Sequence, residues 1–579
     1  MSNNETVIRI LATSDLHGKM VPWNYGVDQE DTHGSMAQLS EALRAYRTEQ
    51  TVYIDAGDLI QDNSAELFLN DSVHPMVQAL NQFDCDIWVT GNHEYNFGIA
   101  TVRKTIADLN ALTLTGNVYL PDGSPLAPGY TILERGGIRI AVIGMTSHNI
   151  RRWDEKNLSD CTVTDMLEET RKIIDSIQGE YDVLIGVYHA GISNECSVPN
   201  TGVTDICNAC PEFDLVISSH EHVRIPELYI NNVLVVQNAS YASTLAVIDL
   251  SLVQEDNTWK LCGRSARSID VGEYPSDPEI LKLLQPYHER ARKNAAIVIG
   301  ELRSGPLVEP PEVNGVPRTL LEDTALIDLI NRVQTHYSQA DISVTSLCSH
   351  LNAVFPEGPI RKCDTVRIYR FPNMLYKVLM TGAQLRKFME FCAQFYNTFR
   401  PGDLTVSFNP AFKRFNYMMF SGVNYEINIS KEPGDRIEHL TWPDGTPVKD
   451  NDRFHVGVNY YCANSCLLHY GDVFREGEEL PVLEETDIRS DLGGVRELID
   501  DYIRNVKHGI LTPEINSNWK LTGISWDPAA HEAAVRLLNN GTLTLPCADG
   551  GSVNSRSIRE EDLPADSYND DRRVSNENN

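Results

Sequence analysis

The protein has 579 residues, of which 42% are hydrophobic and 22% charged, a composition that predicts a globular chain of two to four domains. Its net charge of −32, from 49 basic and 81 acidic residues, argues against nucleic-acid polymers and anionic membranes as partners, because like charges repel at long range. No run of about eighteen consecutive apolar residues predicts a membrane span. Residues 1–18 lack the charged and apolar regions of a secretory signal, so we expect a cytoplasmic protein.

The first 260 residues alternate short Val/Ile-rich runs with amphipathic stretches such as residues 35–50 and 163–178. Runs of this kind are typical of strands that are buried on both faces. Alternation of strand and helix patterns predicts a layered α/β domain with much parallel sheet. The expected strands cover residues 7–15, 51–58, 86–93, 138–147, 182–191, 214–222 and 232–240.

The rest of the chain has a different pattern. We expect residues 1–270 to form the first domain, residues 271–298 a linker helix, and residues 299–524 a second, α+β domain that mixes helical and strand patterns. Residues 525–579 become polar and acidic, which predicts a disordered tail.

The twelve cysteines are scattered along the chain. Cys207 and Cys210 have the spacing of a metal knuckle or a redox motif, but no second pair completes a zinc site. Unpaired thiols are therefore the favoured interpretation, with a metal knuckle as the alternative.

Five of the predicted strands end in side chains that bind metal ions. Strand ends on one edge of an open α/β sheet converge on a shared crevice, so these side chains are expected to meet there. The seven candidates are Asp15, His17, Asp58, Asn92, His189, His220 and His222.

Each of these residues also has a structural explanation when it is taken alone. A strand-end aspartate such as Asp15 can cap the next helix, and Asp58 or Asn92 can serve a turn beside glycine. The complete set favours a pair of divalent cations, which needs one bridging carboxylate and nitrogen and oxygen ligands on each side. Asp58 is the expected bridge. Such a pair produces a hydroxide near neutral pH and clamps phosphoryl oxygens.

The motif series D-x-H, G-D, G-N-H-E, H and H-x-H resembles the calcineurin-like metallophosphoesterases, and more narrowly the 5′-nucleotidase / 2′,3′-cyclic-nucleotide phosphodiesterase family, over about residues 7–524. The resemblance implies a four-layer αββα first domain followed by a 5′-nucleotidase C-terminal domain that binds the substrate. It also implies that one metal is bound by Asp15, His17, Asp58 and His222, and the other by Asp58, Asn92, His189 and His220.

The resemblance further implies catalytic roles around the third motif. His93 corresponds to the histidine that does not bind metal and that stabilises the transition state or protonates the leaving oxygen. The 5′-nucleotidase branch usually has G-N-H-E-F-D, where the aspartate orients this histidine, whereas this chain has "GNHEYN" with Asn96 in that place. Asparagine can hold an imidazole by a hydrogen bond but cannot stabilise an imidazolium by charge.

Other stretches resemble the branch that cleaves 2′,3′-cyclic nucleotides and 3′-nucleotides, including the Trp-Asp-x-x-Asn-Leu pattern that begins at Trp153. In the family, two aromatic rings of the second domain sandwich the nucleobase, and the resemblance assigns Phe415 and Tyr460 to this role. Tyr417 and Tyr461 are the alternatives after a small register error, and all four could instead be core residues. Asn92 and His93 would complete the substrate site at the metals.

The sequence therefore predicts a two-metal phosphoric-ester hydrolase that acts on small nucleotides through a metal-bound hydroxide. We expect 2′,3′-cyclic-nucleotide 2′-phosphodiesterase activity with 3′-nucleotidase activity. The alternatives are a 5′-nucleotidase, a nucleotide-sugar hydrolase, an enzyme for other phosphoesters or sulfur esters, and a non-catalytic nucleotide-binding protein. Histidine, aspartate and asparagine ligands suit two ions of manganese, zinc, cobalt or iron.

Overall fold

The computed structural model describes residues 5–196, 198–256, 258–347, 355–371, 373–547 and 554–564. The chain divides into two compact units, Met1–Asn294 and Ala295–Asn579. None of the helices in the described ranges is both long and apolar enough to cross a membrane.

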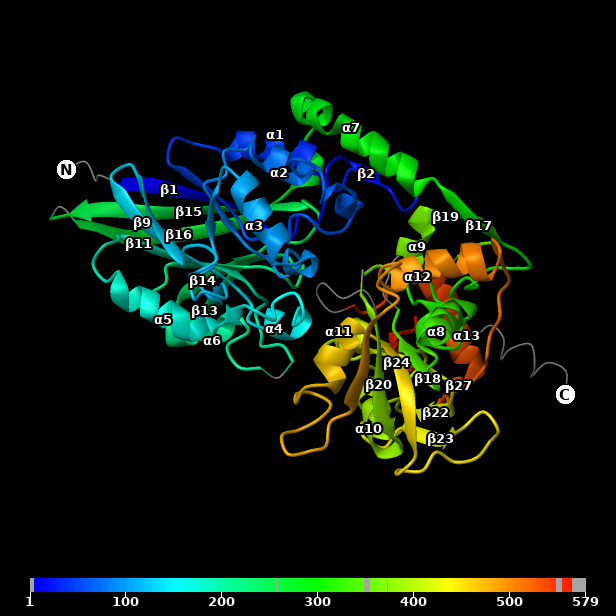
Figure 1. The fold of residues 1–579 in the computed structure, drawn as a ribbon. Coiled ribbons are helices and arrows are strands. Elements are labelled where there is room, and N and C mark those ends of the chain that lie inside the picture. The colour runs from blue at the N-terminus through cyan, green and yellow to red at the C-terminus, as the bar shows by residue number, and fades with distance from the viewer. Residues whose placement is uncertain are drawn as a thin grey trace. The chain divides into compact units, whose positions relative to one another are not determined.

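The first unit contains two six-stranded sheets that pack face to face (Figure 1). In spatial order, the first sheet contains β16 (Thr258–Asp270), β15 (Thr244–Glu255), β1 (Glu5–Thr13), β4 (Thr51–Asp55), β5 (Ile87–Val89) and β6 (Leu112–Leu114). The second contains β13 (Ile225–Ile230), β14 (Val233–Gln237), β12 (Leu215–Ser218), β11 (Val183–His189), β9 (Ile138–Thr146) and β8 (Tyr130–Arg135). Two further sheets have only two antiparallel strands each. One pairs β10 (Thr162–Val163) with β7 (Val118–Tyr119), and the other pairs β2 (Trp23–Asn24) with β3 (Gln29–Glu30).

All seven Val/Ile-rich runs form strands, and the inner faces of both sheets share one apolar core. Within the first sheet, β1, β4, β5 and β6 are parallel, and within the second β9, β11, β12 and β14 are parallel. Parallel neighbours end at the same edge, so the chain segments that follow these strands gather there.

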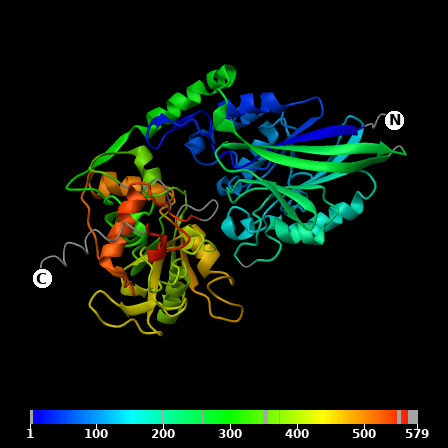
Figure 2. The same ribbon diagram turned by 180° about the vertical axis from the view of Figure 1, so that it is seen from behind.

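Helices cover the outer faces of both sheets and complete the four-layer arrangement, which Figure 2 shows from behind. On the second sheet the outer core is formed with α5 (Met166–Ser176) and α6 (Val203–Ala209), and Cys207 and Cys210 are buried within it. The other side carries α1 (Met36–Tyr46), α2 (Pro75–Leu80) and α3 (Ile99–Asp108), and α4 (Ile150–Trp153) lies in the segment after β9.

The expected linker helix forms as α7 (Pro278–Ala295), but it packs on the first unit. The hydroxyl of Tyr25 lies 3.0 Å from Nδ1 of His288, and the Arg292 guanidinium pairs with Asp28 at 2.8 Å. The helix is therefore part of the first unit rather than a separate linker.

The second unit is an α+β domain with one continuous apolar core. Its five-stranded sheet contains β21 (Met419–Ser421), β18 (Ile342–Thr345), β24 (Arg453–Asn459), β20 (Leu375–Thr381) and β25 (Val482–Ile488). One three-stranded sheet contains β19 (Gly358–Arg361), β17 (Val298–Leu302) and β26 (Ile510–Leu511). The other contains β23 (Ile437–Thr441), β22 (Asn424–Asn428) and β27 (Trp519–Thr522). The helices are α8 (Ala325–Ser338), α9 (Lys362–Ile368), α10 (Gly382–Ala393), α11 (Tyr460–Cys462), α12 (Val495–Asp501) and α13 (Pro528–Asn539).

The prediction of a disordered tail from residue 525 is wrong for residues 525–547 and 554–564. Helix α13 starts after Asp527, whose carboxylate accepts the N–H of Ala530. Its apolar face and Ile558 join the core of the second unit. Apolar residues at helical spacing therefore outweigh the polar composition of this segment. The last part of the predicted tail, residues 565–579, lies outside the described residues.

Candidate metal centre

The structure brings all seven predicted ligands to one edge of the first unit. Asp15 and His17 follow β1, Asp58 follows β4, Asn92 follows β5, His189 ends β11, and His220 and His222 follow β12. Six of them lie in two groups whose possible ligand atoms are within 4.8 Å of one another. Asp58 belongs to both groups.

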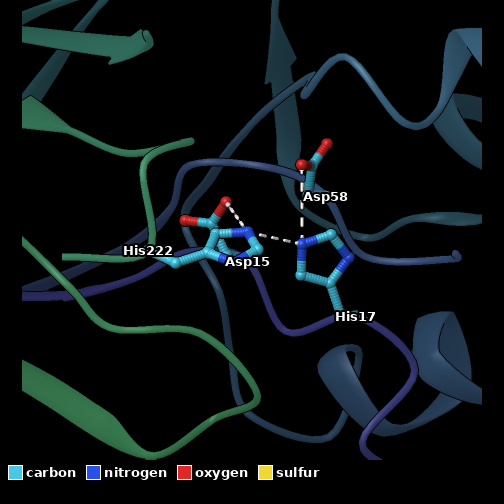
Figure 3. Close-up of side chains that lie close together, drawn as sticks. All are labelled: Asp15, His17, Asp58 and His222. Carbon is cyan, nitrogen blue, oxygen red and sulfur yellow. Dashed lines mark hydrogen bonds and ion pairs between the residues drawn. The ribbon is translucent and has the colours of Figure 1, made fainter. Parts of the chain in front are cut away.

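The first group contains Asp15, His17, Asp58 and His222, and its four side chains point toward a common space (Figure 3). Nε2 of His17 lies 3.0 Å from Nε2 of His222. The same His222 atom is 3.5 Å from Oδ1 of Asp15, and Nε2 of His17 is 3.7 Å from Oδ2 of Asp58.

The second group contains Asp58, His189 and His220, and the amide of Asn92 completes it. Oδ2 of Asp58 lies 3.2 Å from Nε2 of His189. Oδ1 of Asn92 lies 3.0 Å from the same His189 atom and 2.8 Å from Nδ1 of His220. One asparagine and two imidazoles therefore gather on this side of the shared carboxylate.

This donor set fits a pair of divalent cations. Oδ2 of Asp58 is buried between the two groups and accepts no well-directed hydrogen bond from any residue that the structure describes. A buried carboxylate oxygen without a hydrogen bond is costly unless a cation binds it. Nitrogen and oxygen ligands on both sides of one carboxylate are typical of a dinuclear site.

The electrostatic environment also fits positive charge. Burial raises the pKa of Asp15, but the hydrogen bond and charge of His222 outweigh burial and lower the pKa to about 2. Burial lowers the pKa of His17 to about 3, helped by the nearby His222. Ionised carboxylate and neutral imidazole are the forms that bind metal ions. Burial likewise lowers the pKa of His189, but Asp58 and Asp15 outweigh burial and raise it to about 10, so this pocket attracts a proton or a cation.

The loops around the shared carboxylate are held by Glu94, the fourth residue of the GNHE motif. Its buried carboxylate accepts the backbone N–H groups of Asp58 (3.0 Å), Leu59 (2.7 Å) and Gly91 (2.8 Å). A Cβ at Gly91 would lie 2.1 Å from Oδ1 of Asp58, so only glycine allows the two loops to approach this closely. The Gly-Asn pair thus does more than form a turn.

Five of the seven candidate ligands have left-handed backbone conformations, with φ between +20° and +160°, a region that residues other than glycine seldom adopt. Their φ angles are 52° for Asp15, 44° for His17, 58° for Asp58, 75° for His220 and 60° for His222.

His93 lies beside the two groups, as the sequence predicts. Its backbone N–H donates to Oδ1 of Asp58 at 2.9 Å, and its ring centroid is 5.4 Å from that of His17. Nδ1 of His93 lies 2.7 Å from Oδ1 of Asn96, so the expected contact between these two side chains is present.

Three residues that the sequence analysis did not assign to the site also contact it. Nε2 of His220 lies 2.9 Å from Oε2 of Glu195, and the ring of Trp153 stacks on His220 at 5.1 Å. Burial lowers the pKa of His220, but Glu195 outweighs burial and raises it. A carboxylate behind a ligating imidazole orients the ring. The carboxylate of Asp154 contacts Asn96. Trp153 and Asp154 belong to the Trp-Asp-x-x-Asn-Leu pattern, whereas no sequence signal marks Glu195.

The predicted base-binding aromatics lie in the second unit. Phe415 is 37% exposed and meets Tyr461 edge to face, with ring centroids 5.7 Å apart. Tyr460 is half-buried and meets Tyr376 in the same way at 5.3 Å. Tyr417 is 1% exposed, and its hydroxyl accepts a hydrogen bond from the hydroxyl of Tyr396 at 2.7 Å. Tyr417 is therefore a core residue and offers no free face for stacking.

Comparison with known proteins matches each of the two units to a protein family. A family model for calcineurin-like phosphoesterases matches residues 8–224, and a model for the 5′-nucleotidase C-terminal domain matches residues 300–467. The trifunctional nucleotide phosphoesterase protein YfkN of Bacillus subtilis (strain 168) is 23% identical over 91% of this chain, and the chain spans 40% of the length of that protein.

Two further proteins resemble the chain over most of their length. The 2′,3′-cyclic-nucleotide 2′-phosphodiesterase/3′-nucleotidase of Yersinia enterocolitica is 23% identical over 90% of this chain and 88% of its own. A 5′-nucleotidase precursor from Thermus thermophilus has a similar fold, with a TM-score of 0.61, 16% identity, and coverage of 90% of this chain and 100% of that one.

Proposed function

Because the chain belongs to the calcineurin-like phosphoesterases that carry a 5′-nucleotidase C-terminal domain, and is thus a metal-dependent phosphoesterase of the nucleotidase type, we propose that it opens 2′,3′-cyclic nucleotides to 3′-nucleotides and then removes the 3′-phosphate. The observation that carries this proposal is the pair of ligand groups that share Asp58, next to His93. The Yersinia relative supports the choice of substrate.

The proposed centre uses all seven predicted ligands. Two divalent cations bound there would supply a nucleophile from water at neutral pH and would stabilise negative charge on the phosphoryl oxygens. Asp15, His17 and His222 would hold one ion, Asn92, His189 and His220 the other, and Asp58 both.

His93 is the proposed general acid. Its Nδ1 is engaged by Asn96, so Nε2 is the ring nitrogen left to face the substrate. In the first reaction, water adds to phosphorus and loses a proton to solvent, and the bond from phosphorus to O2′ breaks. The imidazolium form of His93 passes its Nε2 proton to O2′, which leaves a neutral ring with the hydrogen on Nδ1. In the second, another water adds to phosphorus and loses a proton, the bond to O3′ breaks, and His93, protonated again at Nε2, protonates O3′, which leaves a nucleoside and inorganic phosphate.

Phe415 and Tyr460 are proposed to stack on the nucleobase. Stacking of a base on an aromatic side chain contributes about 1–3 kcal/mol. The exposure of Phe415 supports this role, since a partly exposed ring can receive a flat base. Replacing Phe415 with alanine should therefore raise KM for nucleotides about tenfold and leave kcat within about twofold. Steady-state kinetics with 3′-AMP will measure both, and an unchanged KM would contradict the assignment.

A panel of substrates tests the proposed function. Phosphate release from 2′,3′-cyclic AMP, 3′-AMP, 5′-AMP and bis-p-nitrophenyl phosphate is measured with manganese and with EDTA, and the diesters are coupled to an added phosphatase. Turnover of the cyclic and 3′ substrates that EDTA abolishes is the expected result. The match of the second unit to the 5′-nucleotidase C-terminal domain favours a second candidate function, 5′-nucleotidase activity, and preference for 5′-AMP would select it.

A further inference from the structure

A buried carboxylate stands behind the amide that contacts His93. Nδ2 of Asn96 donates to both carboxylate oxygens of Asp154, each at 3.1 Å, while Oδ1 of Asn96 lies 2.7 Å from Nδ1 of His93. We propose that Asp154 is a positioning residue for the reaction, because it fixes the orientation of the Asn96 amide and thereby the proton on Nδ1 of His93. This inference rests on the role proposed for His93 above.

The three side chains Asp154, Asn96 and His93 form a hydrogen-bonded relay. The donors and acceptors that each of them offers decide which way the Asn96 amide faces. An ionised carboxylate only accepts hydrogen bonds, so the NH₂ end of the Asn96 amide must face Asp154. The amide oxygen then faces His93, and since this oxygen also only accepts, Nδ1 of His93 must carry the hydrogen. Without Asp154 the amide could turn over and donate to Nδ1, which would then have to carry no hydrogen, so the imidazolium that donates from Nε2 could not form. Asp154 therefore selects the tautomer, and Asn96 transmits this selection.

The surroundings of Asp154 make this orientation rigid. The residue is 2% exposed, and Nδ2 of Asn157 donates both to its Oδ1 (3.2 Å) and to the backbone oxygen of Asn96 (3.0 Å). The backbone N–H of Asp154 donates to the carbonyl of Ile150 at 2.8 Å, which ties the residue to α4. Its neighbour Trp153 stacks on the candidate ligand His220.

A buried carboxylate held only by neutral amides is less stable in its ionised form than a carboxylate in water. Burial raises the pKa of Asp154 to about 6, although hydrogen bonds from Asn96 and Asn157 oppose this effect. Strongly shifted carboxyl groups in clefts are often functional. The geometry of the relay supplies the function here: a carboxylate acts on the catalytic imidazole through one intervening amide.

The first test is Asp154→Asn in the full-length protein. The new amide can present either its oxygen or its nitrogen to Asn96, so the direction of the relay is lost. We expect kcat for 3′-AMP to fall by on the order of 10²-fold, with KM and bound metal per chain unchanged. With bis-p-nitrophenyl phosphate the loss should be below about fivefold, because p-nitrophenolate leaves with little help from an acid.

A double-mutant cycle separates action through His93 from general damage. In the His93→Gln background, adding Asp154→Asn should change kcat by less than about twofold. Equal losses in both backgrounds, or a wild-type kcat in Asp154→Asn, would overturn the proposal. The matched control is Asp214→Asn, a partly buried carboxylate of the same unit that accepts from Leu184 and Arg264, and it should keep the wild-type kcat.

Exchanging the two side chains gives a stricter test. In Asn96→Asp combined with Asp154→Asn, a carboxylate would accept directly from Nδ1 of His93 and the new amide would donate to it, so most of the lost kcat should return. A merely structural role for Asp154 predicts no such rescue.

A spectroscopic measurement keeps the inference separate from the proposed substrate. In protein with isotope-labelled histidine, NMR should show His93, assigned by its loss in His93→Gln, with the hydrogen on Nδ1, and Asp154→Asn should weaken this preference. If the wild type cleaves no nucleotide but shows this tautomer and its dependence on Asp154, the proposed function fails and the inference stands. If nucleotides are cleaved and the tautomer is unaffected by Asp154→Asn, the inference fails alone.

Discussion

Replacing Asp58 with asparagine should lower metal-dependent turnover by about 10³-fold or more and should reduce bound metal to one ion per chain or fewer. Asp58 is the residue shared by both groups of potential ligands. Its Oδ1 accepts the N–H of His93 at 2.9 Å, and its Oδ2 lies toward His17 and His189. Asparagine can keep the first contact but puts an NH₂ group, a donor, where a cation would bind. The fold should survive while the centre is lost.

Steady-state kinetics and metal analysis on the same preparations will measure these effects. The matched control is Asp182→Asn, which also removes a carboxylate charge. Asp182 lies just before the first residue of β11, whereas His189 is the last residue of that strand. Asp182 pairs with Arg139 at 2.8 Å and lies outside both ligand groups. Turnover and metal content in this control should match the wild type. Replacing a bridging ligand should cost far more than a tenfold loss of activity. The bridging role would therefore be wrong if Asp58→Asn kept full metal content and about a tenth of the activity.

Replacing Arg436 with methionine should destabilise the second unit by on the order of 3 kcal/mol or more. Arg436 is 0% exposed, and its side chain donates to the carbonyls of Lys431, Ala393 and Tyr396 and to the hydroxyl of Thr398 at 2.7–3.0 Å. Methionine fills part of the same volume but donates nothing, so these acceptors lose the guanidinium as a partner. Each buried acceptor that is left unsatisfied costs about 1–3 kcal/mol.

Denaturant unfolding followed by circular dichroism will measure this loss. The chain has two compact units, so two transitions are expected, and the one that responds to a chelator reports the first unit. Only the other transition should shift in Arg436→Met. As a control, Arg400→Met removes an exposed pair with Glu432 and should change stability by less than about 1 kcal/mol. A change of similar size in both variants would contradict the role of Arg436.

Arg436 also explains a limit of sequence-based prediction. The apolar pattern of residues 382–399 predicts a helix over the whole stretch, but α10 ends at Ala393. The Arg436 guanidinium lies outside that stretch of sequence, yet it donates to the carbonyls of Ala393 and Tyr396 where the helix stops. A distant side chain thus stabilises the end of the helix, and local periodicity contains no information about it.

The candidate metal ligands were easier to predict from the sequence than the residues that hold the site in place. Ligands at the carboxyl ends of neighbouring parallel strands of one sheet must lie close together, so Asp15 could be placed beside Asp58, and His189 beside His220, from their positions alone. That the two pairs lie in two sheets packed face to face followed only from the family resemblance. Glu195 and Asp154 reach the site from irregular segments, whose paths no periodicity describes. The prediction of a disordered tail failed because it relied on the overall polar composition of the segment. That composition hides the apolar face of α13, which packs on the core.

The left-handed backbone at five of the candidate ligands has a consequence for how such a protein can change over time. Glycine at each of these positions would favour folding by roughly 1 kcal/mol in backbone strain, because glycine adopts this conformation freely. Selection for folding alone would therefore favour glycine at the very positions that the chemistry needs.

Without bound metal, the candidate ligands thus lower the stability of the chain that carries them, and selection for activity opposes their replacement by glycine. A copy of the gene released from that selection would lose its metal centre first and its fold last. Such a descendant would be a stable, inactive protein with both units intact, in which glycines at the strand ends record the lost activity.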